Sequence, residues 1–394
     1  MAWKEIDVFE QRCQFVLLAS QVGVNKSRLC REFGISRPTG DKWLLRYEEG
    51  GLKALHDEPR RPKNFRDETP GYIRDEVYRL RNEHPSWGGR TIRAELLRQG
   101  LESPCARTID RLLKRAGFVK SSSRKRRVIL PENEIVKPNA VNDVWTVDFK
   151  GWWLTRDGKR CEPLTIRDEY SRFVLGIVAL PGTKQEAVKS AFERTFRRYG
   201  LPRYIRSDNG SPFACTRAVG GLSKLSAWWL NHGITPDRIK PASPHLNGAH
   251  ERFHRDMKRE LQQSPAAKLD AEQRRFDRWR RYFNEERPHH ALSMKTPAEV
   301  YKCSQRKYKK NVPAYIYPAG MEDRLVDKNG CISIKHKHHF LSKALYGERV
   351  GLDCVDGITQ VWFRDFLLGV VSPSTRKILP LANPIRDRYS QDDV

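Results

Sequence analysis

The sequence predicts a multidomain protein with an all-α N-terminal part, an α/β middle part and an all-β C-terminal part. Residues 1–60 and 71–119 carry apolar residues at helical spacing, interrupted by turns that contain Gly. From residue 142, short alternating runs typical of strands take turns with helical stretches, and from about residue 312 only strand-like runs remain. The length of 394 residues is sufficient for about two to four domains.

The charge balance indicates a polyanionic partner. Lys and Arg total 74 against 48 acidic residues, which gives a formal net charge of +26. A soluble chain this basic repels itself unless it binds a polyanion; nucleic acid is the commonest one, and an anionic membrane surface is the alternative. No run of about 18 apolar residues occurs, and the first residues lack the apolar core of a signal peptide. We therefore expect a cytoplasmic protein that binds double-stranded DNA and no membrane.

The eight cysteines do not form a recognisable framework. They never occur as a CxxC pair and fall among different expected elements, so we interpret them as reduced, ordinary residues. Cys331, followed by His336, His338 and His339, is the only hint of a zinc site, and it is a weak one.

Residues 1–60 are expected to form a helix-turn-helix DNA-binding domain. A short helix with apolar Leu29 and Phe33 is followed by a turn at Gly34 and by a further helix that Ser36 would cap. A small helical hairpin without any DNA-binding role has the same pattern. If the unit binds DNA, four side chains of its last helix would face the major groove: Arg37, Thr39, Lys42 and Arg46.

A second helix-turn-helix or winged-helix-like unit is expected at 71–119, after a linker at 61–70 that is rich in Pro and charge. Two such units in tandem favour a long site on a duplex. The last helix of this unit would offer three basic side chains to DNA: Arg107, Arg111 and Lys114. A basic linker follows at 120–141, and its cations either track phosphates or are merely solvated: Lys120, Arg124, Lys125, Arg126 and Arg127.

Residues 142–302 are expected to form an α/β domain. "VWTVDFKGWWL" alternates as a strand, "CEPLTIRDEYSRFVLGIVAL" contains two more, and "KQEAVKSAFERTFRRYG" is helical. A short strand "RYIRSD", a helix, a last short strand and the basic helix of "SPHLNGAHERFHRDMKREL" follow. Three strands, helix, strand, helix, strand, helix is the element order of the ribonuclease-H-like fold. Residues 303–394 are expected to form a small β-barrel of about five strands, with a hairpin around Asn329-Gly330.

Three acidic residues stand out by their position in this α/β domain. Asp148 lies inside the first strand, where an ionised group is costly unless it is paired or bound to metal. Asp208 ends the later strand, and Glu251 opens the basic helix. In the expected fold the two strands are neighbours and the helix packs across their ends, so the three carboxylates would converge.

Each acid taken alone has a simpler structural explanation. Glu251 could pair with Arg255 four residues further along the helix. Asp143, Asp168 and Asp237 have similar local settings, and Asp168 is better explained as a turn residue. If the three acids do converge, they repel one another, and oxygen ligands without Cys or His favour Mg²⁺ or Mn²⁺. Two such ions about 4 Å apart would form a clamp for displacement at a phosphodiester.

Three stretches of the sequence resemble a known family when they are taken together. "VWTVDFKGWW", "IRSDNGSPF" and "SPHLNGAHERFHRDMKREL" are similar to the three motifs of DDE transposases of the retroviral-integrase superfamily. "YFNEERPHHALSMKTPAEVY" resembles the segment that closes the catalytic domain in bacterial insertion-sequence members. The tandem helix-turn-helix units also resemble the N-terminal halves of those transposases, so the resemblance covers roughly residues 10–302.

The resemblance implies a ribonuclease-H-like DDE catalytic core in which Asp148, Asp208 and Glu251 hold two Mg²⁺ or Mn²⁺ ions. It implies a DNA transposase that binds the terminal inverted repeats of its mobile element, then cleaves DNA and transfers strands into target DNA. A homodimer or larger assembly on DNA is expected because two ends must be held together, in the bacterial cytoplasm and associated with the nucleoid. Near the acids, four side chains are expected to contact the DNA: Asn247, His254, Arg255 and Lys258.

The sequence departs from the compact retroviral pattern in two respects. Glu251 follows Asp208 by 43 positions (251 − 208), so an extra turn or loop is expected near residues 214–223. The His/Cys zinc module that precedes retroviral cores is absent from this sequence.

Two rival functions stay open on the same fold: a non-catalytic DNA-binding regulator and a plain nuclease. Tyrosine or serine recombination is disfavoured, because no residue of the sequence is marked as the covalent nucleophile that it needs.

Overall fold

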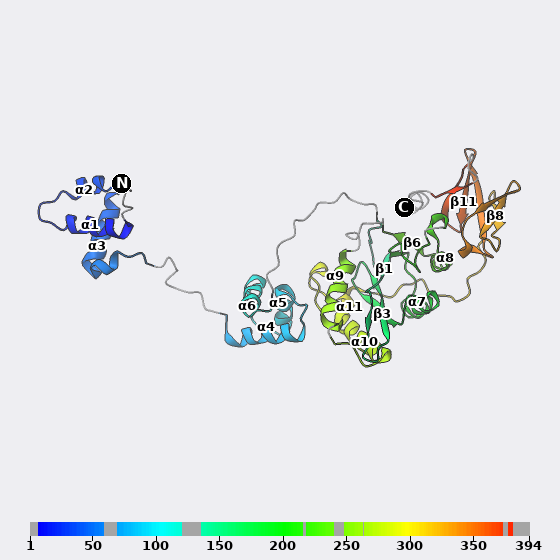
Figure 1. Cartoon of the computed structure of the whole chain (residues 1–394), viewed down its shortest axis with the longest axis horizontal. Helices are drawn as coiled ribbons and strands as arrows, with labels where there is room; N and C mark the ends of the chain where they lie inside the picture. Colours follow the sequence, from blue (N-terminus) through cyan, green and yellow to red (C-terminus); the bar gives the residue numbers. More distant parts are fainter. Residues whose placement is uncertain are drawn as a thin grey trace. The chain divides into compact units, whose positions relative to one another are not determined.

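The computed structural model describes residues 7–58, 69–119, 135–215, 218–239, 248–262, 264–372 and 377–380 (Figure 1). It divides into two compact units, Met1–Glu68 and Thr69–Val394. The described residues contain no helix that is long and apolar enough to cross a membrane.

The first unit is a three-helix domain. Helices α1 (Val8–Ala19), α2 (Lys26–Glu32) and α3 (Arg37–Gly50) surround a small apolar core, and a 3-10 turn at Leu52–Leu55 closes it. Ser36 caps α3 by accepting the backbone N–H of Thr39, as the sequence predicts, and Gly34, in the expected turn, has a positive φ of 67°. Gly40 lets α3 pack closely against α2, since a Cβ at position 40 would lie 2.6 Å from Cys30 Sγ of α2.

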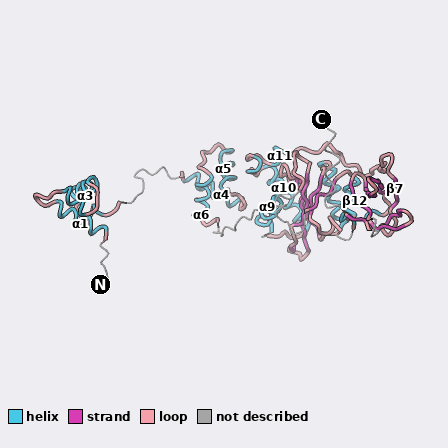
Figure 2. The backbone as a smooth tube through the Cα atoms, turned by 90° about the horizontal axis from the view of Figure 1, so that it is seen from above, coloured by secondary structure: helices cyan, strands magenta, loops and turns pink. Residues whose placement is uncertain are grey.

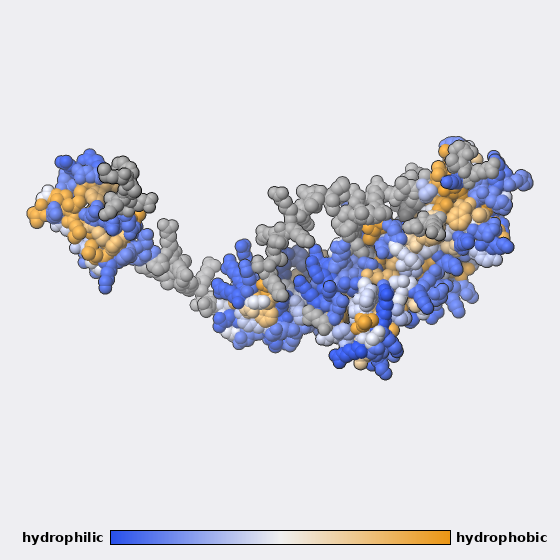
Figure 3. All heavy atoms as spheres, viewed as in Figure 1, coloured by the Kyte–Doolittle hydropathy of each residue, from blue (hydrophilic) through white to orange (hydrophobic). Residues whose placement is uncertain are grey.

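Apolar side chains also lie on the outside of this first unit. Figure 3 shows apolar residues on its visible surface. Val8, Leu17 and Leu45 are each more than half exposed, and Val22 is fully exposed.

The second unit begins with another three-helix arrangement. Helices α4 (Gly71–Glu83), α5 (Gly89–Arg98) and α6 (Ala106–Arg115) pack around Val77, Ile92 and Ile109. Helices α5 and α6 meet at Gly89, whose backbone N–H donates to Asp110 Oδ1 at 2.9 Å and where a Cβ would clash with Ala106 O.

The α/β part has the element order that the sequence predicts. Its sheet runs β2-β3-β1-β5-β6, with β4 paired to the other side of β3. Strands β1 (Val144–Phe149), β3 (Arg160–Asp168) and β4 (Val174–Leu180) are antiparallel neighbours, with the short β2 (Trp153–Leu154) added to β3. Strands β5 (Tyr204–Ser207) and β6 (Thr235–Arg238) are parallel to β1. This is the ribonuclease-H-like arrangement.

Two layers of helices cover this sheet, as Figure 2 shows for α9 and α10. Helices α7 (Gln185–Tyr199) and α8 (Lys224–Asn231) pack on one apolar core with Trp145 and Val147 of β1. Helices α9 (Gly248–Met257) and α10 (Leu269–Glu285) share another core with Val174 and Ile177 of β4. A π-helical turn (Lys258–Gln262) extends α9, and η5 (His290–Leu292) and α11 (Pro297–Val300) follow α10. The expected extra turn after Asp208 is η2 (Val219–Gly221).

The C-terminal strands do not form the expected closed barrel in the described residues. Strands β7 (Glu322–Leu325), β10 (Arg349–Val355), β11 (Ile358–Phe363), β12 (Phe366–Val371) and β13 (Ile378–Leu379) make an open antiparallel sheet of order β13-β12-β11-β10-β7. Strands β8 (Cys331–Ile334) and β9 (Lys337–Phe340) form a separate two-stranded ribbon, and a 3-10 turn (Lys343–Leu345) precedes β10. The sheet packs on Leu222, Ala227 and Leu230 of the α8 region instead of closing on itself.

The expected hairpin at Asn329-Gly330 is also different. Asp327 Oδ1 accepts the backbone N–H groups of Asn329 and Cys331, both at 2.8 Å, so this segment is a local turn. Strand β7 pairs with β10, and the real hairpin, β8 to β9, turns at Lys335 and His336, both of which have positive φ.

Candidate active site

Asp148 and Asp208 lie level with each other on neighbouring parallel strands. Val144 pairs with Tyr204 and Thr146 with Arg206. Two residues beyond this last pair, the same register brings Asp148 level with Asp208, which directly follows β5. Alternation along β1 turns Trp145 and Val147 into the α7–α8 core, so Asp148 points to the opposite face.

Glu251 is brought to this edge of the sheet by helix α9. Phe253 and Met257 are buried on the inner face of that helix, which fixes its rotation. His250 and His254, one turn apart on the same helix, bond to Thr165 Oγ1 of β3 at 2.7 and 2.8 Å. Glu251 lies in the first turn of α9 and is exposed.

The electrostatics of Asp148 show that the charges of the other two acids reach it. Burial, then the negative charge of Asp208 and, to a smaller extent, that of Glu251 raise the pKa of Asp148 from 3.8 to about 7. The backbone N–H of Phe149 and the Lys150 ammonium act in the opposite direction. Asp208 and Glu251 therefore both act electrostatically on Asp148, and the positive charge of Lys150 does not offset their effect together with burial.

Three other acids of the α/β part, Asp143, Asp168 and Asp237, have structural roles. Asp168 accepts the backbone N–H of Asn142 and two bonds from Ser171, as expected of a turn residue. Asp237 is paired with Arg206 at 2.8 Å, and Asp143 accepts the backbone N–H groups of residues 139 and 140.

The carboxylates of Asp148, Asp208 and Glu251 have no such cationic partner. No Lys or Arg of the described residues lies within 4.0 Å of any of them, and the simple Glu251–Arg255 ion pair is not formed. Their donor set consists of three oxygen-bearing side chains with an excess of negative charge, which fits a hard divalent cation. A second group, Asp148, His250 and His254, has ligand atoms within 4.8 Å of one another.

His254 does not lie where a phosphate contact requires it. Only 8% of the residue is exposed, and its ring faces Thr165 and Asp148 beneath the helix. We therefore withdraw the predicted phosphate contact. Arg255 and Lys258 are exposed and keep that prediction. Lys150, which the sequence did not single out, is half-buried and close enough to Lys258 and Asp148 for both charges to act on its pKa.

The four side chains of α3 that were predicted to contact the DNA major groove differ in exposure and in ion pairing. Arg37 and Lys42 are exposed, although Arg37 pairs with Asp41 at 3.2 Å, and Thr39 is half-buried. Arg46 pairs with Glu58 at 2.7 Å and covers the Trp43 ring, so it is the least available of the four.

Arg107, Arg111 and Lys114 are all exposed along one face of α6. Six further predicted contacts lie outside the described residues: Lys120, Arg124, Lys125, Arg126, Arg127 and Asn247.

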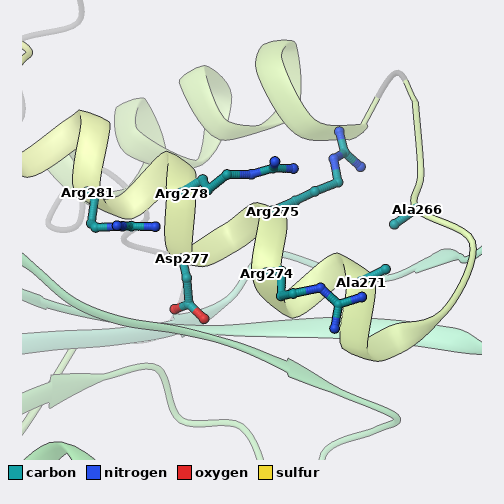
Figure 4. A pocket seen from close by; sticks show the side chains of 7 residues that line it. All are labelled: Ala266, Ala271, Arg274, Arg275, Asp277, Arg278 and Arg281. Atoms are coloured by element: carbon teal, nitrogen blue, oxygen red, sulfur yellow. The ribbon is translucent and has the colours of Figure 1, made fainter.

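Helix α10 carries a basic stripe that the sequence analysis missed. Arg274, Arg278 and Arg281 are exposed at helical spacing, and no carboxylate of the described residues lies within 4.0 Å of them. Together with Arg275 they surround a cavity of about 590 Å³ (Figure 4). The signal was present as Arg at i, i+4 and i+7, opposite the apolar Phe276, Trp279 and Phe283 of the same helix.

Thr165 and His250 were also missed. Thr165 is the cross-strand partner of Asp148 in the β1–β3 ladder, which only the pairing register reveals. His250 and His254 share a helix face at i and i+4, and that spacing could have marked them as a pair.

Four models of known domain families match parts of the chain. "Integrase core domain" matches residues 138–244 and, in a second form, residues 232–297. "Helix-turn-helix domain" matches residues 11–63, and "Homeodomain-like domain" matches residues 39–113.

Two curated bacterial proteins are similar to the chain. The uncharacterized 31.7 kDa protein of insertion element IS407 from Burkholderia multivorans is 28% identical over 284 residues, which are 72% of this chain and 92% of that protein. The uncharacterized 39.2 kDa protein of insertion element IS476 from Xanthomonas euvesicatoria is 27% identical over 222 residues, which are 56% of this chain and 62% of that protein.

Solved structures superpose loosely. The HTLV-2 integrase catalytic core domain in complex with magnesium (trimeric form) has a TM-score of 0.31 at 16% identity, and covers 42% of this chain and 100% of its own. A simian T-cell lymphotropic virus intasome in complex with PP2A regulatory subunit B56 gamma has a TM-score of 0.37 at 14% identity, and covers 75% of this chain and 99% of its own.

Proposed function

We propose that this chain is an insertion-sequence transposase of the retroviral-integrase superfamily, which binds the terminal inverted repeats of its element and catalyses metal-dependent DNA cleavage and strand transfer. The observation that carries the proposal is the raised pKa of Asp148, on which Asp208 and Glu251 both act. A partly buried carboxylate that is destabilised by two neighbouring acids and lacks a protein cation is typical of a site whose cation is a bound ion.

We assign two Mg²⁺ or Mn²⁺ ions to Asp148, Asp208 and Glu251. When bound, such ions supply Lewis-acid stabilisation of the negative charge that develops at the scissile phosphate. Lys150 lies near both Asp148 and Lys258, and the two lysines would hold the neighbouring DNA phosphates.

The proposed reaction has two displacements at phosphorus. In the first, water attacks a phosphodiester at the element end, the bond from phosphorus to O3′ breaks, and a 3′-hydroxyl and a 5′-phosphate are released. In the second, that 3′-hydroxyl attacks a phosphodiester of the target DNA and displaces its O3′. One diester is made for each one broken, so strand transfer needs no energy source.

DNA binding is assigned to exposed basic surfaces. Arg37 and Lys42 of α3 and the three cations of α6 would contact the element end, and the arginine stripe of α10 would contact phosphates of the same or the target duplex. Because two ends must be joined together, we propose a homodimer or larger assembly on DNA, acting on nucleoid DNA in the bacterial cytoplasm.

The test is a cleavage and strand-transfer assay on a labelled duplex that contains an element end, with Mg²⁺ or Mn²⁺ and a target plasmid. Asp148→Asn, Asp208→Asn and Glu251→Gln should each abolish cleavage while end binding stays within a few fold. Glu285→Gln, which changes an exposed acid at the end of α10, is the matched control and should cleave normally.

Each alternative function gives its own result in this assay. A regulator would bind the end and never nick it, and a plain nuclease would cut without joining. Cleavage by any of the three carboxylate variants would refute the role of that residue.

A further inference from the structure

A single hydroxyl connects strand β1, strand β3 and helix α9 next to Asp148. Thr165 Oγ1 lies 2.8 Å from the backbone carbonyl oxygen of Asp148, 2.7 Å from His250 Nε2 and 2.8 Å from His254 Nε2. All three contacts are within hydrogen-bond distance; the two histidine contacts are buried and the contact to Asp148 is partly buried.

The donors and acceptors around Thr165 can be assigned in only one way. The carbonyl oxygen of Asp148 can only accept, so the single hydroxyl hydrogen of Thr165 goes to it. The two lone pairs that remain on Oγ1 must then each receive an N–H, because two bare atoms at 2.7–2.8 Å would repel. His250 and His254 are therefore both protonated at Nε2.

Each ring that donates from Nε2 keeps Nδ1 as its second nitrogen. Nδ1 of His254 lies 3.8 Å from Asp148 Oδ2, longer than the charge-assisted hydrogen bond that a protonated Nδ1 would make to this carboxylate, so this nitrogen carries no proton. His250 Nδ1 accepts the hydroxyl hydrogen of Thr146 at 2.8 Å, which is shorter than the 3.4 Å from that hydroxyl to the carbonyl oxygen of Arg167. Both nitrogens of His250 are used in this way.

His254 Nδ1 has no donor of this kind among the described residues. Its neighbour is Asp148 Oδ2 at 3.8 Å, which is too long for a hydrogen bond and is itself an acceptor. A lone pair facing a carboxylate oxygen is unfavourable unless a cation binds both. Two ligands of one ion lie at most about 4.2 Å apart, twice the usual bond length of about 2.1 Å, so one ion could bind both atoms.

We propose that His254 Nδ1 is a nitrogen ligand, beside Asp148, of a divalent ion in this site. Thr165 and His250 are positioning residues in this proposal, because they fix the His254 ring and keep its Nδ1 unprotonated. The inference rests on the proposed function, which assigns metal to Asp148. An imidazole ligand favours Mn²⁺ and similar transition ions over Mg²⁺, so the site should bind Mn²⁺ more tightly than an all-oxygen site would.

The experiment is electron spin-echo envelope modulation on the full chain with a substoichiometric amount of Mn²⁺. The native protein should show ¹⁴N coupling to the ion, and labelling its histidines with ¹⁵N should replace that coupling by ¹⁵N features. His254→Gln should remove the coupling and weaken Mn²⁺ binding at least tenfold, with a smaller effect on Mg²⁺. Thr165→Val should weaken Mn²⁺ binding although it touches no ion, and Thr165→Ser, which keeps the hydroxyl, should restore it.

The outcomes separate this inference from the proposed function. If Asp148→Asn abolishes Mn²⁺ binding but His254→Gln keeps the nitrogen coupling, the inference is wrong and the assigned carboxylate site survives. If Asp148→Asn leaves Mn²⁺ binding and coupling unchanged, both fail. The ¹⁵N-labelled native protein decides the question even if His254→Gln does not fold, because a bound Mn²⁺ without histidine coupling overturns the inference.

Discussion

Replacing Asp148 by Asn should stabilise the metal-free protein at neutral and alkaline pH, and should have almost no effect on stability at acidic pH. The pKa of Asp148 is raised from 3.8 to about 7 in the folded state. Between these values the unfolded chain releases a proton that the folded chain keeps, so folding stability falls as pH rises. The penalty is nearly absent at pH 4, grows up to pH 7 and is constant above it.

The magnitude follows from the size of that shift. About three pKa units at about 1.36 kcal/mol each give a ceiling of about 4 kcal/mol. The Asp148 side chain is 30% exposed, and solvent screening reduces the effect to roughly 2 kcal/mol. Asp148→Asn should therefore be more stable than the native chain by about this amount at pH 8, with almost no difference at pH 4.

The difference in stability between the native chain and Asp148→Asn can be measured by urea-dependent hydrogen exchange with mass spectrometry, in the presence of EDTA. Peptides from β1 and β3 report on the α/β part separately from the helical domains. Adding Mn²⁺ should stabilise the native core by about 2.7 kcal/mol at a hundredfold excess over Kd and leave the variant unchanged. Equal stability of the two proteins at pH 8, or a difference that does not depend on pH, would show that Asp148 is not under electrostatic strain.

Three further predictions concern surfaces and packing. Replacing Arg274, Arg278 and Arg281 of α10 by Gln should lower the slope of log K against log salt for DNA binding by about 3, since each phosphate contact contributes about 0.9. The control replaces three exposed arginines of α7 by Gln: Arg194, Arg197 and Arg198. An equal loss of slope in the control would refute a specific role of the α10 stripe. Gly40→Ala should destabilise the first unit by about 1–3 kcal/mol, as measured by thermal unfolding, because its Cβ would lie 2.6 Å from Cys30 Sγ. Gly23→Ala is the control, because a Cβ there meets nothing within 4 Å but the φ of Gly23 is positive, so this variant shows the effect of backbone strain without overpacking. Charge reversal of Arg37 and Lys42 should weaken binding to the element end more than to unrelated DNA in a mobility-shift titration, whereas an equal loss on both would assign these side chains to general phosphate contacts.

The convergence of the three acids could be expected from the sequence because it depends on element order. Once β1 and β5 are parallel neighbours, residues at the ends of both strands share an edge of the sheet, so Asp148 and Asp208 meet there. The basic helix after β6 has to cross the same edge to pack on the sheet. None of this needs the identity of any side chain that touches the acids.

The orientation of His254 could not be predicted in the same way. Glu251 is exposed while His254, three residues further along α9, is buried, and the periodicity of the helix allows both placements. The choice is made by Phe253 and Met257, which enter the α10 core, and by Thr165, a polar partner on a strand far away in sequence. A histidine in a basic helix therefore looks like a surface cation until its acceptor is known.

Barrel closure is a second property that local patterns do not contain. Alternation and turn residues predict strands, but closure requires hydrogen bonds between the edges β7 and β13, and these are set by how the sheet meets its neighbours. Here the sheet uses its apolar face to cover Leu222 and Leu230, which leaves the two edges apart in the described residues. A closed barrel would have to turn that apolar face inward.

Stability and chemistry meet on strand β1. Its alternation sends Trp145 and Val147 into the α7–α8 core and presents Thr146 and Asp148 to helix α9. The apolar half of the strand fixes the backbone, so Asp148 cannot move away from the charges that raise its pKa. A strand that was free to shift would relieve the repulsion by moving. Because β1 is held between two cores, the repulsion is instead available as binding energy for a cation.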